Sequence, residues 1–381
     1  MACPPLLFAP PLTFPLPCRP PVVLLFDSMR SLQILPELPQ GAKILFIRLR
    51  SLGDTLLATP LYACLKAWRP DLQLAVLVEE PNQEVLEGNP DLHDLLTIPS
   101  RSPGNSTLSQ RIAMLRRIRS LGFDCSIDLH GGSTSALFTL LGGAKYRIGL
   151  KSLRHRYAYN VGLTAPARDN SKHHTVEHQM EWLRQLGLPA GEIPPLKLVV
   201  TPEDKLRARE RLAAAGVDPC HSYVVIQPAS RFSTKEWTDE GFADIADYLV
   251  TEWGWKVVMT GSRLEGEKLR RIAARASYPP VIFGDLNICE LKAVLAGARL
   301  FIGNDSGPTH MAAALSIPVV VLFGSSDSRV WYPWKTRYCL VQNPFDCNPC
   351  PGYQCLVYEE PRCILSITPE QVKAAIDSIL T

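Results

Sequence analysis

The sequence predicts an α/β protein with two Rossmann-like domains, each built on a parallel sheet, that face one cleft. From Ala42 onward, short apolar runs alternate with amphipathic segments of about ten to fifteen residues, which is typical of parallel strands covered by helices on both faces. This alternation pauses in the Gly- and Pro-containing stretch 187–195 and then starts again. A chain of 381 residues is also longer than one typical domain.

The expected elements follow from this alternation, taken in order along the chain. In the first domain, residues 41–190, we expect strands at 43–48, 72–78 and 124–129 and helices at 55–68, 110–121, 133–141 and 176–186. In the second domain, residues 196–366, we expect strands at 223–227, 256–260, 300–302 and 319–323, helices at 202–215, 239–252, 264–276 and 288–298, and a further helix ending at Leu315. A last helix over 368–380 begins with Thr368 as N-cap and Pro369 at the first position.

Composition and missing motifs exclude several functions. The net charge of +3, from 40 Lys and Arg against 37 Asp and Glu, is too small to indicate a nucleic-acid-binding protein. No G-x-G-x-x-G follows the first strand of either half and no G-x-x-x-x-G-K-[ST] occurs, which weakens a dehydrogenase or a P-loop NTPase. Because no Asp-x-Asp pair is present to hold a divalent metal against a diphosphate, we expect metal-independent chemistry with no required cofactor.

The first forty residues form a Pro-rich leader that we expect to lie outside the folded domains. Its apolar residues are interrupted by ten prolines, a density that prevents both a helical signal-peptide core and a strand ladder. Met29 precedes a polar stretch and then the first strand. Two interpretations stay open for residues 1–28. They are a disordered extension, or they are not translated because the protein starts at Met29.

Four arginines gather on one predicted helix, at Arg111, Arg116, Arg117 and Arg119. The simpler interpretation is a solvated helix face, and the alternative is contact with an anionic membrane surface. No run reaches the roughly 18–20 apolar residues that span a bilayer.

The turn after the first strand is the first candidate for chemistry. Ser51-Leu52-Gly53-Asp54 supplies small residues for a tight strand-to-helix turn and a carboxylate near a helix N-terminus. Asp54 is either an N-cap or a general base that removes a proton from an acceptor hydroxyl at the carboxyl edge of the sheet.

The turn after the strand at 300–302 has the features of an anion site. A polar turn before a helix directs free backbone N–H groups and the positive end of the helix dipole at a ligand. A capped helix explains some of its polar residues but not a histidine one turn further on. The candidate residues here are Asp305, Ser306, Gly307, Thr309 and His310.

Two more turns follow strands of the second domain. Ser230, Arg231 and Lys235 can clamp a diphosphate without a metal, or belong to a solvated loop. Glu265 can bind ribose hydroxyls, or be a surface residue in a first helical turn.

Together, these four turns resemble glycosyltransferase family 9, the bacterial ADP-heptose:lipopolysaccharide heptosyltransferases. The matching motifs are K-I-L-F-I-R-x-R-S-L-G-D-x-x-L-x-T-P and I-D-L-H-G in the first half, and S-x-x-x-x-K-x-W and G-N-D-S-G-P-T-H-x-A-A-A-L-x-I-P-V-V-V-L-F-G in the second. The resemblance extends from about Ala42 to the C-terminal helix. It implies a GT-B fold with the acceptor on the first domain, the nucleotide sugar on the second, and the C-terminal segment 367–381 packed back on the first.

The resemblance also implies roles for individual residues. Asp54 matches the general base of an inverting transfer, Ser230 and Lys235 the phosphate contacts, and Glu265 the ribose-binding acid. The turn 305–310 matches the donor site. A looser match offers acceptor-binding candidates at Asp128, His130, Ser133, Arg154 and Arg156.

The implied partners are an ADP-sugar donor and a glycolipid acceptor of the lipopolysaccharide core, either lipid A-Kdo or a heptosylated form. Such an acceptor suggests a cytoplasmic enzyme in peripheral contact with the inner face of the inner membrane. Two alternatives stay open: a transferase for another nucleotide sugar, and a nucleotide-sugar epimerase of related fold.

Four cysteines lie close together near the end of the second domain, at Cys347, Cys350, Cys355 and Cys363. Their spacing fits a zinc site, an iron–sulfur centre or two disulfides. In a cytoplasmic enzyme disulfides are disfavoured, so a structural metal is the expectation to test.

Overall fold

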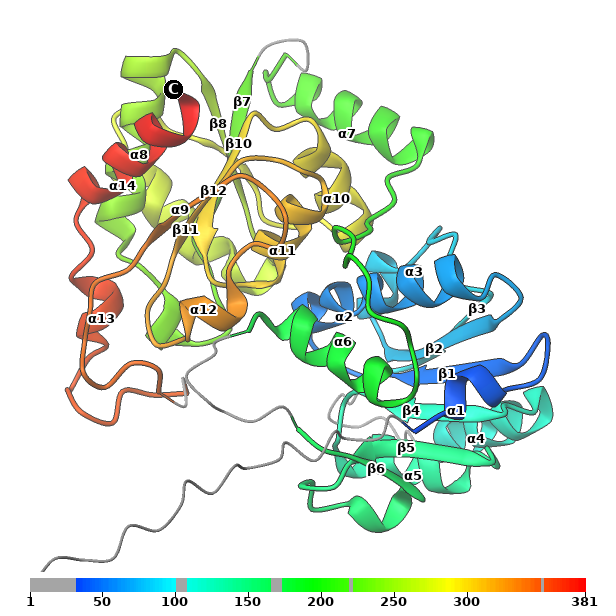
Figure 1. The fold of residues 1–381 in the computed structure, drawn as a ribbon. Coiled ribbons are helices and arrows are strands. Elements are labelled where there is room, and N and C mark those ends of the chain that lie inside the picture. Colours follow the sequence, from blue (N-terminus) through cyan, green and yellow to red (C-terminus); the bar gives the residue numbers. More distant parts are fainter. Residues whose placement is uncertain (1–31, 101–107, 166–172, 219–221, 351–352) are drawn as a thin grey trace, which may run out of the picture. The chain divides into compact units, whose positions relative to one another are not determined.

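The computed structural model describes residues 32–100, 108–165, 173–218, 222–350 and 353–381, and it confirms the α/β class (Figure 1). It contains two six-stranded sheets in which every strand pair is parallel. We call residues 32–200 the first half and residues 201–381 the second half, because each range carries one sheet.

The elements of the first half alternate between strands and helices. They are α1 (Ile34–Glu37), β1 (Lys43–Ile47), α2 (Leu52–Leu57), α3 (Thr59–Trp68), β2 (Gln73–Glu79), η1 (Asn82–Val85), β3 (Asp94–Ile98), α4 (Leu108–Leu121), β4 (Cys125–Asp128), α5 (Ser133–Leu141), β5 (Tyr146–Leu150), η2 (Arg156–Ala158), β6 (Val161–Leu163) and α6 (Thr175–Gln185).

The second half repeats this alternation. Its elements are α7 (Pro202–Ala214), β7 (Tyr223–Gln227), η3 (Ser233–Lys235), α8 (Asp239–Trp253), β8 (Lys256–Thr260), η4 (Arg263–Glu265), α9 (Gly266–Arg275), β9 (Val281–Phe283), α10 (Ile288–Ala296), β10 (Leu300–Asn304), α11 (Gly307–Ala314), β11 (Val319–Leu322), α12 (Ser328–Trp331), β12 (Tyr338–Val341), α13 (Arg362–Leu365) and α14 (Pro369–Leu380).

Both halves have the same strand order. The first sheet runs β3-β2-β1-β4-β5-β6 and the second runs β9-β8-β7-β10-β11-β12, so each places its first and fourth strands side by side. This is the Rossmann order, in which ligands bind beyond the carboxyl ends of the strands where the order reverses. In this chain those positions lie between β1 and β4 and between β7 and β10.

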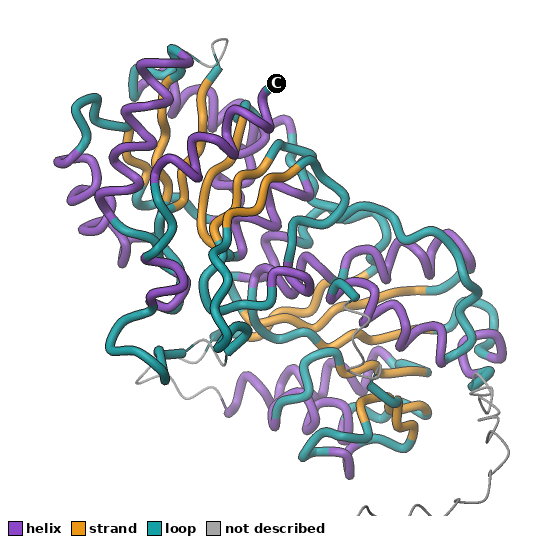
Figure 2. Tube along the Cα trace, turned by 60° about the vertical axis from the view of Figure 1, so that its left-hand side comes forward, coloured by secondary structure: helices purple, strands orange, loops and turns teal. Residues whose placement is uncertain are grey.

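The central strands are apolar on both sides because helices cover both faces of each sheet (Figure 2). β7 and β10 are buried at every residue, and β1 at all but its first. This continuous burial is why these strands read as apolar runs in the sequence. Strands β3, β5, β6, β9 and β12 were not predicted, because each includes residues that are only half-buried, and β6 and β9 are only three residues long.

Two segments differ from the expected domain boundaries. Residues 32–40 belong to the first half: α1 buries Leu35, and the backbone N–H groups of Leu32 and Leu35 donate to Gln185 and Leu186. The rest of the leader, residues 1–31, lies outside the described residues.

The expectation that the C-terminal helix packs on the first domain is wrong. α14 contacts β11, β12 and α8, all in the second half, and Figure 1 shows it beside α8. Its apolar stripe, Val372, Ile376 and Ile379, is part of the core around β8 and β10, and Asp377 accepts a hydrogen bond from Tyr248 of α8. Burial of this stripe therefore holds the helix on the second sheet.

Candidate functional site

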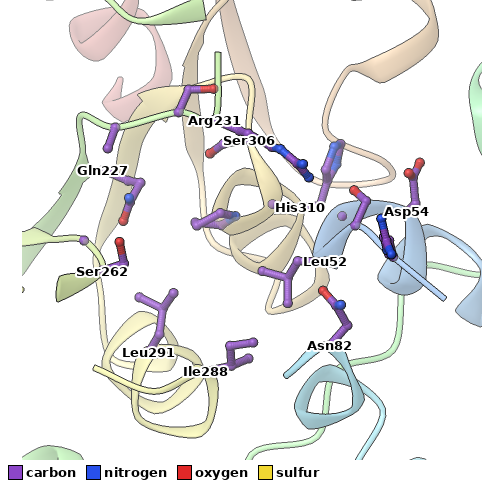
Figure 3. Close-up of a pocket in the computed structure, with 18 of the residues that line it drawn as sticks. Leu52, Asp54, Asn82, Gln227, Arg231, Ser262, Ile288, Leu291, Ser306 and His310 are labelled. Carbon is purple, nitrogen blue, oxygen red and sulfur yellow. The ribbon is translucent and has the colours of Figure 1, made fainter. Parts of the chain in front are cut away.

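A cavity of about 970 Å³ is lined by residues of both halves at the carboxyl ends of their strands. Figure 3 shows Leu52 and Asp54 from the first half and Arg231, Ser306 and His310 from the second around it. The cavity therefore lies where the strand order predicts a ligand in each half.

Asp54 is the third residue of α2 and lines the cavity. Ser51 occupies the N-cap position with φ +70° and makes no side-chain capping bond, so Asp54 is not the N-cap. The Asp54 carboxylate forms an ion pair with Arg48, with Oδ2 at 2.6 Å from Nη2. Arg48 is held in turn by donating from Nη1 to the Leu129 carbonyl, which ties β1 to the end of β4. The carboxylate is thus oriented by a fixed arginine and is still partly open to the cavity.

The loop after β7 places Ser230, Arg231 and Lys235 on the cavity wall. The Nζ of Lys235 lies 2.7 Å from Oδ2 of Asp305, which is nearly buried. Asp305 has no other charged partner in the described part of the chain, so it positions the lysine that faces the cavity. We therefore interpret Asp305 as holding Lys235 rather than as a contact to phosphate.

The turn after β10 carries two polar atoms that are buried without a partner, Ser306 Oγ and His310 Nδ1. Both residues line the cavity, and burial lowers the pKa of His310, which favours a neutral ring. Because an unpaired buried polar atom costs free energy, both atoms are suited to a ligand that supplies the missing hydrogen bonds. Gly307 of the same turn also lines the cavity, at the start of α11.

Thr309 is the one donor-site candidate that does not reach the cavity. Its side chain is buried, and its hydroxyl donates to the Asn304 carbonyl at 2.7 Å. Asn304 in turn donates to the Pro228 carbonyl and accepts from the Trp237 N–H, which joins the β7 and β10 loops. Thr309 thus stabilises the turn.

The two halves meet where α2 and α11 begin. A Cβ built on Gly53 would lie 2.9 Å from Cδ2 of His310, and one built on Gly307 would lie 2.8 Å from Cδ2 of Leu52. Neither position has room for a side chain. Glycine is therefore required at both, and it allows Asp54 to approach the turn that carries His310.

Glu265 lines the far end of the cavity together with Gly261 and Ser262. Its Oε2 accepts a hydrogen bond from the Ser262 N–H at 2.6 Å. Leu286, Ile288 and Leu291 also line the cavity, and Figure 3 shows Ser262 close to Ile288 and Leu291. This end therefore combines a carboxylate with apolar side chains, as a ribose and its base require.

None of the five acceptor-binding candidates lines the cavity. Asp128 is fully buried and accepts hydrogen bonds from the His130 N–H, the Gly131 N–H and the Tyr159 hydroxyl, so it organises the loop after β4 and is not available to a ligand. His130 is half-buried beside Arg48, and its pKa is lowered by burial and then by that arginine. The others, Ser133, Arg154 and Arg156, are exposed.

The sequence interpretation missed a charged cluster in the first half. Nε of Arg50 lies 2.5 Å from Oε2 of Glu79, and both residues line the cavity. Arg111 of α4 lies 3.5 Å from the same carboxylate and donates to Thr134 at 3.1 Å. Two features of the sequence could have indicated this cluster. Arg50 is the second arginine of the R-x-R before the Ser51 turn, and Glu79 lies at the end of a predicted strand.

The four clustered cysteines all have free thiols and line one small cavity. Burial raises the pKa of Cys363, and the three neighbouring thiols act in the same direction. Among the described residues, however, no group of three or more His, Cys, Asp or Glu side chains is placed to hold a metal ion. The structural metal therefore stays a prediction.

Within the part of the chain that the structure describes, no helix is long and apolar enough to cross a membrane.

The chain is similar to known proteins over most of its length. The model of "Glycosyltransferase family 9 (heptosyltransferase)" matches residues 111–359. Lipopolysaccharide heptosyltransferase 3 of Escherichia coli is 30% identical over 297 residues, which cover 75% of this chain and 84% of that protein. Among solved structures, a family 9 glycosyltransferase from Veillonella parvula superposes with a TM-score of 0.78 at 22% identity, covering 92% of this chain and 99% of that one. The E. coli ADP-heptose lipopolysaccharide heptosyltransferase II superposes with a TM-score of 0.73 at 20% identity, covering 89% and 98%. These two structures share the fold of the chain.

Proposed function

The chain belongs to glycosyltransferase family 9, and from this premise we propose that it transfers a heptose from ADP-heptose to the inner core of lipopolysaccharide. The names of the relatives support this substrate pair: one is a lipopolysaccharide heptosyltransferase and another acts with ADP-heptose. The observation that carries the proposal is that Asp54 of one half and the Lys235 and Ser306 turns of the other line a single cavity.

The donor fits the second half of this cavity. The diphosphate would lie between Lys235 and the first turn of α11, where Ser306 Oγ and His310 Nδ1 lack partners. Lys235, Arg231 and the helix N-terminus together supply positive charge, so the proposed reaction needs no metal ion. The ribose and adenine would lie beside Glu265 and the apolar side chains of α10.

The reaction is a single displacement. The Asp54 carboxylate takes the proton of the acceptor hydroxyl, whose oxygen attacks the anomeric carbon of the heptose. The bond from that carbon to the diphosphate oxygen breaks on the opposite face, so the configuration inverts and ADP leaves. Lys235 stabilises the negative charge that develops on the leaving phosphate. Arg48 holds the Asp54 carboxylate in position before the transfer, and the ion pair is replaced by a hydrogen bond to the neutral carboxylic acid once Asp54 has taken the proton.

The acceptor would approach from the side of Arg50 and Glu79, which line the first-half wall of the cavity. Because this acceptor is a glycolipid, we place the enzyme in the cytoplasm, peripherally bound to the inner face of the inner membrane.

The test is the turnover of Asp54→Ala and Asp54→Asn with ADP-heptose and a heptose-deficient core acceptor. Loss of the base should lower kcat by about 10²–10⁴-fold, while calorimetry should find ADP binding unchanged because Asp54 lies on the acceptor side. Asp244→Ala is the matched control, since Asp244 is exposed on α8 and does not line the cavity. Near-normal turnover in Asp54→Ala would refute the role of Asp54, and a stabilising thermal shift with UDP but not ADP would refute the donor.

A further inference from the structure

The outward side of α4, α5 and η2 exposes large apolar side chains. Leu108 of α4 is 66% exposed, Leu137 of α5 is 54% exposed, and Tyr157 of η2 is 68% exposed. Ile112 and Leu141 are exposed as well. Residues 108 and 112, like 137 and 141, are four apart and therefore lie on one side of their helix. We call these five residues, with Arg116 and Arg119, the α4–α5 face.

These elements form one continuous surface. Figure 1 shows α4 and α5 on the side of the first sheet opposite to α2 and α3. The Arg111–Thr134 hydrogen bond joins their first turns, and a Cβ on Gly143, just after α5, would lie 3.9 Å from Cγ of Arg119 near the end of α4. η2 in turn contacts α5.

The same region carries an excess of positive charge. Residues 108–165 contain nine Lys and Arg against two Asp, a balance of plus seven in a chain whose net charge is +3. Neither aspartate is exposed, because Asp128 is buried and Asp124 is half-buried. Eight of the basic residues form no ion pair with any described residue: Arg116, Arg117, Arg119, Lys145, Arg147, Lys151, Arg154 and Arg156.

We propose that the α4–α5 face is the surface that docks on an anionic lipid bilayer. Exposed leucines between unpaired arginines match an interface where apolar side chains enter the acyl boundary and cations meet lipid phosphates. A nucleic acid or an acidic protein would use the arginines, but neither accounts for the protruding leucines. The proposal deepens the proposed function, from which it takes only that the acceptor is lipid-linked.

The face also connects to the cavity. Arg111, in the first turn of α4 beside this face, lies 3.5 Å from the Glu79 carboxylate on the cavity wall. The N-terminal ends of α4 and α5 therefore lie beside the cavity at the carboxyl edge of the first sheet. A saccharide whose lipid stays in the bilayer can reach Asp54 along this edge.

The test is co-sedimentation of the full chain with vesicles, without any turnover assay. Vesicles of phosphatidylcholine alone are compared with vesicles of equal parts phosphatidylcholine and phosphatidylglycerol. We expect binding to the anionic vesicles only. The Leu137→Ser/Leu141→Ser pair and the Arg116→Gln/Arg119→Gln pair should each lower the partition coefficient by about tenfold or more.

The second half supplies matched controls on α7. Leu206 is 58% exposed, and Arg207 and Arg209 are exposed without ion pairs to described residues. Leu206→Ser and Arg207→Gln/Arg209→Gln should leave vesicle binding unchanged. All these side chains are on the surface, so thermal unfolding should match that of the wild type and exclude misfolding as the cause.

Absence of binding to anionic vesicles would overturn the proposal, as would equal losses from the α7 variants. Binding that depends on the arginines but not on the leucines would also overturn it, because the apolar side chains would then not enter the acyl boundary of the bilayer. Because no step of the test requires donor or acceptor, these outcomes are independent of whether the enzyme transfers heptose.

Discussion

The two halves share one strand order, yet they use the position where that order reverses in different ways. In the second half, the loops after both β7 and β10 line the cavity, with Lys235 from one and Ser306 and His310 from the other. In the first half, the loop after β1 lines the cavity with Asp54, but the candidates after β4 do not. At this position, the same topology thus provides two cavity-lining loops in the second half and one in the first.

The difference comes from how each half uses an aspartate at the end of its fourth strand. Asp305 pairs with Lys235 and keeps that cation at the cavity. Asp128 has its hydrogen-bonding capacity taken by two backbone N–H groups and Tyr159, whose pKa is raised by burial and by this carboxylate. An aspartate at this point of a Rossmann sheet is therefore not by itself a sign of a binding site. What it binds within the chain decides its role.

Of the changes that test this comparison, the largest effect is expected from the second-half cation. Lys235→Ala should lower kcat/KM for ADP-heptose by about 10²–10³-fold, because the charge that develops on the leaving diphosphate loses its nearest side-chain partner. Steady-state kinetics measures this. Lys256→Ala is the matched control, since Lys256 is exposed at the start of β8. A Lys235→Ala enzyme as active as the control would break the assignment of the donor to this half.

An intermediate effect should separate the two aspartates. Asp128→Asn replaces an acceptor of three hydrogen bonds with an amide that also donates, so the free energy of unfolding should fall by about 2 kcal/mol. Urea denaturation measures the loss, and turnover of the remaining folded enzyme should stay near that of the wild type.

Asp305→Asn is the counterpart of Asp128→Asn. For this variant we expect a large loss of turnover and only a small decrease in the free energy of unfolding. If Asp128→Asn instead raised KM for the acceptor without loss of stability, the loop after β4 would also bind substrate. The first half would then use both loops at this position, as the second half does, and the contrast between the halves would be wrong.

An effect of similar size, which appears only as the pH falls, concerns the contact that joins the halves at His174. This residue precedes α6, accepts from the Val176 N–H through Nδ1, and lies 2.9 Å from the Tyr332 carbonyl through Nε2. It also stacks on Trp334, and burial lowers its pKa to about 3. The unfolded chain therefore takes up a proton near pH 6.5 that the folded chain does not take until about pH 3, so stability should fall as pH decreases through this window.

At pH 5 the loss from His174 should be about 2 kcal/mol relative to pH 7. Urea denaturation over a pH series checks this, and His174→Gln should be less stable at pH 7 but have a shallower dependence on pH. The exposed His93 is the control, and His93→Gln should keep the wild-type slope. If the free energy of unfolding depended on pH equally in the wild type and in His174→Gln, the His174 ring would not be held neutral at this contact between the halves.

Much of the fold was predictable because its central strands are buried on both faces. β7 and β8 begin and end where the apolar runs predict. The predicted helix at 55–68 is divided at Ala58 into α2 and α3, with Pro60 in the first turn of α3. This break was detectable in principle, because proline lacks the N–H that an interior helical position needs.

The lining of the cavity was predictable where a short motif carries its own geometry. Asp54, Ser230, Lys235 and Ser306 all lie in turns that end strands, and all line the cavity. The errors concern residues whose role depends on distant partners. Asp128 is closed off by Tyr159, which is 31 positions away, and Glu79 is paired with Arg111 of another element. Pairing across such separations leaves no periodic signal in one sequence.

The glycine contact between α2 and α11 has a consequence for engineering. Because a Cβ on Gly53 would lie 2.9 Å from the His310 ring and 3.6 Å from Gly307 Cα, and a Cβ on Gly307 would lie 2.8 Å from the Leu52 side chain, the spacing between the two turns is set by these two glycines and by the two side chains that pack on them. A chimera that joins the first half of this chain to the second half of a relative would inherit the spacing only if all four positions match. Residues 53 and 307, rather than the ligand contacts, are therefore the first to check when halves with different donor or acceptor preferences are recombined.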